Sequence, residues 1–321
     1  MNAMTKLVSA LQGAGYGDRL LRDEPMALHT SFGVGGPADL FIRAEHIGEL
    51  IEWLRLARAH EVPCIVLGGG TNVLVADAGI RGLVILNACE GHTIDEDGRV
   101  VAESGVSLRE LARHTVAQGW EGLEWAVGIP GTIGGAVVGN AGAYGGYMAD
   151  VVQEAQLLDA DGQVRRVRRN DLGFGYRTSA LKRVGAGEQR PIVLEAVMQL
   201  RPGDVQELAA RAEQVTLQRQ ARTPRGACAG SMFKRTQNYP AGFLIEQAGL
   251  KGLQIGGAQI SPQHANFFMN CGNASAQDVV RLIEIAQEQV WRDFQERLEP
   301  EIELIGAWPE AAVLEMASRG G

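Results

Sequence analysis

The chain of 321 residues has 38 acidic and 30 basic side chains, a net charge of -8 and a pI of about 5.4. No run of Lys and Arg offsets this acidic balance, so the composition argues against binding to nucleic acid or to anionic surfaces in general. The length suffices for two or three domains with buried cores, and 45% hydrophobic and 21% charged residues are ordinary for a globular protein.

Neither a metal site nor a membrane segment is expected. The four cysteines, Cys64, Cys89, Cys228 and Cys271, form no C-x-x-C pair and have no histidine at a ligand spacing, which favours buried thiols over a zinc site. Residues 1–21 lack both a basic start with a continuous apolar core and the length needed to span a bilayer. We therefore expect a cytoplasmic protein.

The first third of the chain predicts a strand, a helix and a second strand. After a short helix within residues 1–28, we expect a strand at 38–43 and a helix at 46–60, where apolar residues recur near helical spacing. A buried strand at 62–67 then leads into the glycine loop Gly68–Asn72.

Turn and capping signals define the next elements. After a strand at 82–87, Asp97-Gly98 predicts a hairpin. Ser107 and Glu110 form a capping-box pattern for a helix that stops at Gly119.

A glycine-rich stretch at 128–146 holds eight glycines in nineteen residues. Glycine loses the most backbone freedom on folding, so this density indicates positive φ angles or close approach to a ligand such as a phosphate. The stretch lacks the Gly-Lys-Ser/Thr of a Walker A loop. The nearest match to the dinucleotide fingerprint, Gly33–Ala38, leads into a strand-like run where that motif needs a helix. A phosphate loop of another kind is predicted, and a turn cluster without a ligand is the alternative.

The remaining elements mix helices and strands, so the sequence predicts an α+β fold. Asp161-Gly162 predicts a second hairpin, and Thr223–Gly226 is interpreted as a link between domains. The other expected elements are a strand at 191–200, a helix at 203–221, a short helix ending at Gly249, a strand at 256–260, a long helix capped by Ser275 and Asp278 and ending near 296, and a strand at 301–305.

Seven separated motifs resemble those of the UDP-N-acetylenolpyruvoylglucosamine reductase family, in the family's order. They are Gly68–Asn72, Gly128–Gly135, Asn140–Gly145, Tyr176–Ser179, Gly230–Lys234, His264–Phe267 and Leu298–Ile302. The resemblance implies an FAD enzyme of peptidoglycan precursor synthesis, in which NADPH reduces the flavin and UDP-N-acetylglucosamine enolpyruvate is then reduced to UDP-N-acetylmuramate. It also implies an FAD-binding domain of the vanillyl-alcohol-oxidase type, in subdomains 1–88 and 89–222, and a smaller α+β substrate-binding domain at 223–321.

The implied cofactor agrees with the two glycine loops, because loops that follow strands can bind a pyrophosphate through backbone N–H groups without lysines. Neither loop contains a histidine or cysteine for covalent attachment, so non-covalent FAD is expected. By resemblance, the cofactor-binding residues are Gly68, Gly69, Gly70, Thr71, Asn72, Gly128, Ile129, Pro130, Gly131, Thr132, Gly134, Gly135, Asn140, Gly142, Tyr144 and Arg219.

Reducing an enol ether conjugated to a carboxylate requires hydride at one carbon and a proton at its neighbour. Such a site needs a cation for the charge that collects on the carboxylate, and a proton donor. By resemblance, Arg177 is the cation, Ser231 the proton donor and Glu301 the catalytic carboxylate. Taken singly, each has an ordinary alternative: a surface arginine, a turn cap and a solvated strand residue.

The resemblance assigns substrate contacts to Tyr176, Arg222, Lys234, Arg235 and His264. Arg235 stands where the family usually has asparagine, and its guanidinium could instead bind the substrate diphosphate. His264 could equally be a core residue beside Phe267, and on composition alone Arg222, like Arg219, is only a solvated helix face.

Further features leave alternatives open. Gly139 stands where a methionine is common in the family, which could loosen the packing near the flavin. The short segment between Arg177 and Pro191 predicts the subgroup that lacks one substrate-covering loop. A monomer is favoured. The rival interpretations are another flavin oxidoreductase of the same superfamily and a non-catalytic protein that binds flavin or a sugar nucleotide.

Overall fold

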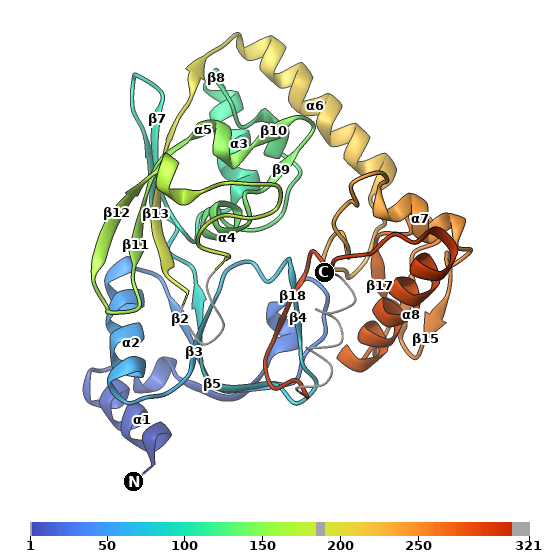
Figure 1. Ribbon diagram of the computed structural model, residues 1–321. Helices are drawn as coiled ribbons and strands as arrows, with labels where there is room; N and C mark the ends of the chain where they lie inside the picture. Colours follow the sequence, from blue (N-terminus) through green and yellow to red (C-terminus); the bar gives the residue numbers. More distant parts are fainter. Residues whose placement is uncertain (1, 184–189, 310–321) are drawn as a thin grey trace. The chain divides into compact units, whose positions relative to one another are not determined.

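The computed structural model describes residues 2–183 and 190–309, and the chain divides into two compact units (Figure 1). Unit 1 comprises Met1–Leu20, Ile42–Gly69 and Val84–Arg219. Unit 2 comprises Leu21–Phe41, Gly70–Leu83 and Gln220–Gly321. The expected domains, 1–88 and 89–222 for FAD and 223–321 for the substrate, were defined by what each segment binds. These boundaries stay a prediction.

Unit 1 contains a five-stranded antiparallel sheet with the order β12-β11-β13-β7-β6. Both predicted hairpins are confirmed, and the glycines of their Asp-Gly turns, Gly98 and Gly162, have φ angles of 75° and 80°. The strands are β6 (His92–Ile94), β7 (Arg99–Glu103), β11 (Val152–Leu158), β12 (Val164–Arg168) and β13 (Ile192–Gln199), the last of which was predicted at 191–200.

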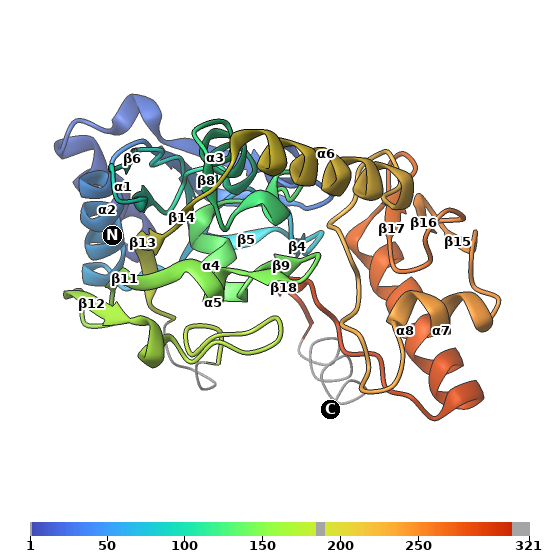
Figure 2. The same ribbon diagram turned by 90° about the horizontal axis from the view of Figure 1, so that it is seen from above.

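Unit 1 also contains helices, the last of which, α6, ends in unit 2. The helix α1 (Ala3–Gly13) packs beside α2 (Ile47–Ala59), as Figures 1 and 2 show. In α3 (Leu108–Ala117), the Glu110 N–H donates to Ser107 Oγ at 3.4 Å. That is one half of the predicted capping box; among the described residues, the return bond from Ser107 N–H to the Glu110 carboxylate is not formed. The remaining helices are α4 (Ile133–Gly139), α5 (Met148–Val151) and α6 (Val205–Arg222).

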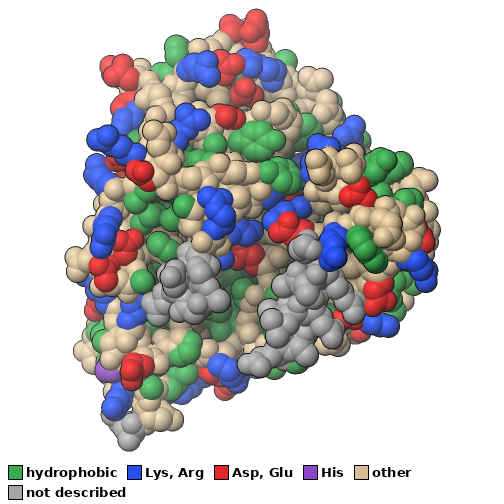
Figure 3. All heavy atoms as spheres, viewed as in Figure 1, with side chains coloured by type: hydrophobic (Ala, Val, Ile, Leu, Met, Phe, Trp, Pro, Cys, Tyr) green, Lys and Arg blue, Asp and Glu red, His purple; other side chains and the backbone are tan. Residues whose placement is uncertain are grey.

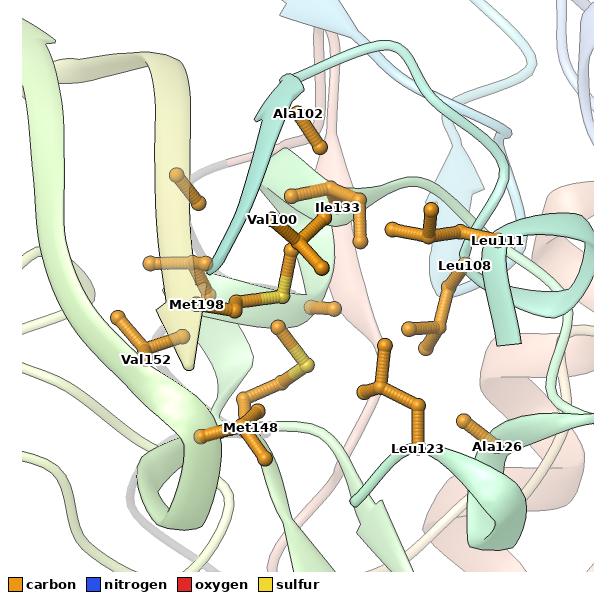
Figure 4. Close-up of a cluster of buried hydrophobic side chains, with 14 of the residues drawn as sticks. Val100, Ala102, Leu108, Leu111, Leu123, Ala126, Ile133, Met148, Val152 and Met198 are labelled. Carbon is orange, nitrogen blue, oxygen red and sulfur yellow. The ribbon is translucent and has the colours of Figure 1, made fainter. Parts of the chain in front are cut away.

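The core of unit 1 joins the sheet to α3, α4 and α5 (Figure 4). Apolar side chains from these elements point toward one another and are almost fully buried. They include Val100, Leu108, Leu111, Ile133, Met148, Val152 and Met198. Ile133, Ala136 and Val137 bring α4 into this packing, and the helix lies in the middle of the glycine-rich stretch.

The interpretation of the whole glycine-rich stretch as a loop is wrong, because residues 133–139 form α4. A Cβ at Gly134 would lie 2.9 Å from the Ser104 Cβ, so glycine here allows the helix to approach the chain after β7 closely. Tertiary packing therefore overrides the poor helix propensity of glycine.

A second sheet has the strand order β1-β2-β5-β3, and the boundaries between the two units fall within β2 and β5. Its strands are β1 (Leu21–Pro25), β2 (Pro37–Ala44), β5 (Ile80–Asn87) and β3 (Cys64–Leu67). The predicted strand–helix–strand order is confirmed by β2, α2 and β3. The Gly33–Ala38 motif leads into β2 and not into a helix, which agrees with the exclusion of a dinucleotide fingerprint there.

Unit 2 is built around α8 (Ala276–Phe294), which packs beside α7 (Ala241–Gln247) (Figure 2). The predicted capping box of Ser275 and Asp278 is confirmed. The carboxylate of Asp77 also accepts the N–H groups of Ala276 and Gln277, at 2.7 and 3.0 Å. The strand β4 (Val73–Val75) pairs in parallel with β18 (Glu303–Ile305), and β15 (Gln254–Ile255), β16 (Ala258–Ile260) and β17 (Phe268–Asn270) form an antiparallel sheet.

Two-stranded pairs complete the regular structure, with β8 (Trp120–Glu121) against β14 (Arg201–Pro202) and β9 (Gly142–Ala143) against β10 (Gly146–Tyr147).

Lys and Arg side chains lie among Asp and Glu side chains on the face in Figure 3. Of the helices that the structure describes, none has both the length and the apolar character needed to cross a membrane.

Candidate functional site

The second predicted glycine loop lies in unit 1 with Gly68 and Gly69 of the first loop, whose other residues belong to unit 2. Gly68 follows β3, and a Cβ at this position would lie only 2.6 Å from the hydroxyl oxygen of Thr132 in the second loop. Any residue other than glycine would push these loops apart. Thr132 in turn caps α4, because its Oγ1 accepts the Gly135 N–H at 3.4 Å.

Backbone donors remain available along both loops. Within residues 2–183 and 190–309, no group accepts a hydrogen bond from the N–H of Gly69, Gly70 or Thr71, nor from that of Gly131 or Thr132. Successive N–H groups of this kind are suited to the oxygen atoms of a pyrophosphate. The residues present therefore fit the cofactor that the sequence implies.

The helix α6 brings Arg219 to the second loop. A Cβ at Gly128 would lie 2.7 Å from the Arg219 Cδ, so the aliphatic part of this side chain lies directly on the glycine. A cation beside backbone N–H donors adds to the attraction for an anion. Arg219 was predicted as a cofactor-binding residue, and that role stays a prediction.

Arg177 is held in unit 1 by the chain that follows α4. Its Nη1 donates to the Gly142 carbonyl at 2.8 Å, and its guanidinium carbon lies 5.6 Å from the centre of the Tyr176 ring. The Arg177 φ angle is 53°, in the left-handed region that residues with a Cβ rarely adopt. Such backbone strain is concentrated at functional sites.

Two further hydrogen bonds join the Tyr176–Ser179 motif to the Asn140–Gly145 motif. Asn140 Nδ2 donates to the Gly175 carbonyl at 2.9 Å, and the buried Ser179 Oγ donates to the Val138 carbonyl at 2.7 Å. The sequence did not predict these contacts, which connect residues some 35 to 41 positions apart. These bonds connect the two motifs, and together the motifs hold the Arg177 guanidinium in place.

In unit 2, two hydrogen-bonded segments bring Ser231 and Glu301 close in the structure. The Glu301 N–H donates to the carbonyl of Met232, the residue after Ser231, at 2.8 Å. Ser231 forms a β-bridge with Phe267, and Phe233 forms one with Pro300. We call the residues Ser231, Met232, Phe233, Asn266, Phe267, Pro300 and Glu301 the Ser231–Glu301 cluster.

The side chain of Asn266 locks this cluster from inside. It is 7% exposed, its Oδ1 accepts the Phe233 N–H at 3.0 Å, and its Nδ2 donates to the Phe233 carbonyl at 2.8 Å. Sequence analysis missed this role, although Asn266 lies in the His264–Phe267 motif. The available signal was an asparagine two residues after a predicted site histidine.

Two family models match the chain. One described as an FAD binding domain matches residues 38–168, and one described as the C-terminal domain of UDP-N-acetylenolpyruvoylglucosamine reductase matches residues 220–305. The enzyme of that name from Synechococcus sp. (strain JA-3-3Ab) is 44% identical over 293 residues, which cover 90% of this chain and 92% of the relative. The chain belongs to the UDP-N-acetylenolpyruvoylglucosamine reductase family.

Other members of the UDP-N-acetylenolpyruvoylglucosamine reductase family agree with this assignment. The relative from Alkaliphilus oremlandii is 41% identical and covers 90% of this chain and 94% of its own length. The crystal structure of the Thermus caldophilus enzyme superposes with a TM-score of 0.74 at 36% identity and covers 90% of this chain and 98% of that chain. The expected α+β fold with an FAD-binding domain and a separate C-terminal domain is confirmed.

His264, which the resemblance assigns to the substrate of this family, is half-buried. Burial lowers the pKa of its imidazole, and the charges of Lys251 and Arg222 lower it further against the opposing effects of its own backbone and Glu246. His264 Nδ1 accepts the Asn266 N–H at 3.2 Å. A neutral ring in this arrangement carries its proton on Nε2, where it can be donated to a ligand.

The other predicted substrate residues differ in their surroundings. Lys234 forms an ion pair with Glu299, and its side chain is 18% exposed. Arg222 and Arg235 are exposed, and the Tyr176 side chain is 46% exposed. Contact of any of these residues with the substrate stays a prediction.

Two predicted cofactor contacts acquire a structural role inside the chain. A Cβ at Gly142 would lie 2.2 Å from the Tyr147 ring, and the Gly142 carbonyl holds Arg177. Asn140 ends α4 with a φ of 44°, and both its amide atoms bond to backbone groups, at Gly175 and Ala149. These residues support the site from within, and contact with FAD stays a prediction for them, as for the exposed Tyr144.

The cysteines are free thiols in the described chain. Burial raises the pKa of Cys64 and of Cys89 to about 12, which keeps both protonated at neutral pH. The expectation of buried thiols is confirmed for Cys89. Cys64 and Cys228 are half-buried, and the expectation is wrong for Cys271, which is exposed just after β17. Among the residues that the structure describes, no three His, Cys, Asp or Glu side chains group as metal ligands.

Proposed function

We propose that Arg177, Ser231 and Glu301 carry out, in this chain, the reaction of the UDP-N-acetylenolpyruvoylglucosamine reductase family. As a member of that family, the chain uses FAD and NADPH to reduce UDP-N-acetylglucosamine enolpyruvate to UDP-N-acetylmuramate in peptidoglycan precursor synthesis. The observation that carries the assignment of residues is the hydrogen bond from the Glu301 N–H to the Met232 carbonyl, since it joins the two predicted catalytic segments.

The cofactor is bound through the glycine loops. A bound FAD would supply the hydride chemistry between NADPH and the enolpyruvyl group. The N–H groups of Gly69, Gly131 and Thr132 in unit 1 would hold the pyrophosphate oxygens, and Arg219 would add a positive charge beside Gly128. The binding is non-covalent.

Arg177 stabilises the negative charge that develops on the substrate carboxylate. Guanidinium is planar, always charged and able to form two parallel hydrogen bonds with a carboxylate. The Gly142 carbonyl and the Tyr176 ring support this group from the protein side. A cation whose position is fixed in advance lowers the barrier without reorganisation during the reaction.

Ser231 delivers the proton and Glu301 assists it. The Ser231 Oγ donates to the carbon next to the one that receives the hydride, and the Glu301 carboxylate orients and polarises the acidic group. A serine hydroxyl is a poor acid unaided, so this role requires a neighbour. We assign this part to Glu301, whose backbone N–H is bonded to the carbonyl of Met232, the residue after Ser231.

The substrate diphosphate and sugar are bound by Tyr176, Arg222, Lys234, Arg235 and His264. The bound NADPH and sugar nucleotide, together with four free thiols, favour the cytoplasm. We propose that the protein acts there as a monomer that does not bind nucleic acid.

Anaerobic stopped-flow absorbance tests the function in two steps. NADPH should bleach the flavin absorbance of the purified protein, and the enolpyruvyl sugar nucleotide should then restore it. Bleaching without recovery by this substrate would indicate another flavin oxidoreductase, and no bleaching at all would indicate a binding protein. Acid precipitation should release the yellow cofactor into the supernatant, and colour that stays in the pellet would contradict non-covalent binding.

A further inference from the structure

Asn72 ends the first glycine loop and directly precedes β4. In the parallel pair of β4 and β18, Val73 is aligned with Glu303. The Glu303 N–H donates to the Asn72 carbonyl at 2.9 Å, which extends this ladder by one residue. Asn72 therefore lies against the segment that contains Glu301, and both belong to unit 2.

The side chain of Asn72 is directed at Glu301 itself. Its Nδ2 donates to the Glu301 carbonyl at 3.1 Å. One residue thus contacts the chain on both sides of Ile302, which is 6% exposed. One of the two N–H groups of the Asn72 amide is therefore used for this bond within the protein.

These contacts fix both peptide groups next to the Glu301 Cα. The N–H of Glu301 is bonded to the Met232 carbonyl at 2.8 Å, and its carbonyl is bonded to Asn72. The positions of N, Cα and C' determine the direction of the Cα–Cβ bond. Two hydrogen bonds on opposite sides of this Cα therefore set where the Glu301 side chain begins, relative to Ser231.

We propose that the Asn72 side chain is a positioning residue for Glu301, and that it acts on the proton-delivery step and not on cofactor binding. The proposal rests on the proposed catalytic role of Glu301. The backbone N–H groups of the loop bind the cofactor, while the Asn72 amide holds the catalytic carboxylate in register with Ser231. A displacement of about 1 Å at a reacting group can cost on the order of a hundredfold in rate.

The test compares the two half-reactions in Asn72→Ala holoenzyme. Reoxidation of reduced flavin by the enolpyruvyl substrate should slow by about tenfold or more. Flavin reduction by NADPH and the dissociation constant for FAD, measured by fluorescence titration of the apoprotein, should each stay within about threefold, a free-energy change of under about 0.7 kcal/mol. If FAD affinity falls and both half-reactions slow together, the side chain belongs to the cofactor site and the proposal is wrong.

Asn270→Ala is the matched control. Asn270 also belongs to unit 2, and its Nδ2 donates to the carbonyls of Phe32 and Gly33 at 3.1 Å. The substitution removes the same kind of bond to a distant segment without touching Glu301, and it also removes the Oδ1 that accepts the N–H groups of Gly272 and Ala274. An equal slowing of reoxidation in this variant would mean that loosening of the unit, and not the position of Glu301, limits the reaction.

A double-mutant cycle with Glu301→Ala tests the role of Asn72 separately from the catalytic role of Glu301. If Asn72 acts through Glu301, Asn72→Ala should slow reoxidation in the native background and have no further effect on Glu301→Ala. Unchanged reoxidation in Glu301→Ala alone would overturn the role of Glu301. A full additional loss in the double variant would overturn only the role of Asn72. Should Asn72→Ala fail to fold, Asn72→Leu keeps a side chain of similar shape, adds no charge and removes the donor, and the same outcomes apply to it.

Discussion

The two glycine loops and the Ser231–Glu301 cluster use the backbone in opposite ways. Along the loops, the N–H groups of five residues have no acceptor among the described residues, and glycines allow segments to approach closely. In the cluster, backbone groups are bonded to distant segments and hold the reacting side chains in place. The loops are suited to binding an anion, and the cluster to moving a proton.

This difference implies that substitutions in the two regions should affect different measurements. Changes in the loops should alter the affinity for FAD or the stability of the fold. Changes in the cluster should alter the half-reaction that consumes the sugar-nucleotide substrate.

The largest expected effect is that of Ser231→Ala, which removes the proposed proton donor. Reoxidation by the enolpyruvyl substrate should slow by about two to four orders of magnitude, the usual loss for a positioned general acid. Flavin reduction by NADPH should stay near the native rate, because no proton from Ser231 is needed there. Ser231→Cys keeps an ionisable proton and should recover part of the rate.

Ser275→Ala provides the control for this variant. Ser275 caps α8 in the same unit, so its loss should cost about 1 kcal/mol of stability and change both half-reactions modestly and equally. If Ser231→Ala behaves in this way, with reoxidation within a few-fold of the native rate, Ser231 is only a turn residue.

Arg235→Ala should have the next largest effect, on the Michaelis constant for the sugar nucleotide. A charge-assisted contact with the diphosphate corresponds to about 1.5–3 kcal/mol, or roughly a ten- to more than hundredfold rise in this constant. The turnover number should change less, since binding is lost equally in the ground state and the transition state.

Arg281→Ala is the corresponding control, because Arg281 is exposed on α8 and paired with Glu284. Steady-state kinetics of both variants decide the question. The same Michaelis constant in the two variants would assign Arg235 to the solvated surface.

Gly134 and Gly135 sharpen the comparison within a single helix. A Cβ at the buried Gly134 would lie 2.9 Å from the Ser104 Cβ, whereas at the exposed Gly135 its nearest neighbour would be Thr132 Oγ1 at 3.7 Å. Gly134→Ala should lower the free energy of unfolding by about 1–3 kcal/mol through overpacking. Gly135→Ala should raise it by up to about 1 kcal/mol, because alanine is the better helix former.

Denaturant unfolding of the apoproteins measures these two changes. If Gly135 is glycine because the cofactor approaches it, Gly135→Ala should also weaken FAD binding without loss of stability. Equal destabilisation by both substitutions would show that packing alone explains the pair.

His264 should give the smallest effect, through the pH dependence of stability. Burial lowers its pKa in the folded state, so the unfolded chain takes up the proton first as the pH falls. The neutral ring contributes its full share to the free energy of unfolding above the pKa of the unfolded state, about 6.5. This contribution is lost as the pH falls from there toward the lower pKa of the folded state.

His264→Gln should therefore reduce the loss of thermal stability between pH 7 and pH 5, as followed by calorimetry. The exposed His46 provides the control substitution, His46→Gln. An unchanged pH dependence in His264→Gln, or the same change in His46→Gln, would contradict the effect of burial.

Elements with a strong local signal were predictable from the sequence. The Asp-Gly hairpins, the capping box of Ser275 and Asp278, and the periodic helix α2 all depend on interactions within a few residues. The density of glycine likewise indicated the two loops. Glycine loses much backbone entropy on folding, and a particular conformation or contact has to offset this loss.

Contacts between distant segments were not predictable in the same way. The helix α4 forms because Gly134 fits against Ser104, and a local reading of its glycines indicated a loop. The bond between Asn72 and Glu301 spans 229 positions, and the role of Asn266 depends on Phe233. No local pattern determines the partner of such an amide.

The capping of α8 by Asp77 has a consequence for synthesis of the chain on the ribosome. Asp77 and Ala276 are 199 residues apart, which corresponds to roughly 10–40 s of translation at typical rates. During that interval β4 has been made, but its partner β18 has not. The edge of β4 is therefore open to incorrect pairing. Chaperone binding to nascent chains should therefore concentrate on residues 70–83 and end when residues 276–305 have emerged.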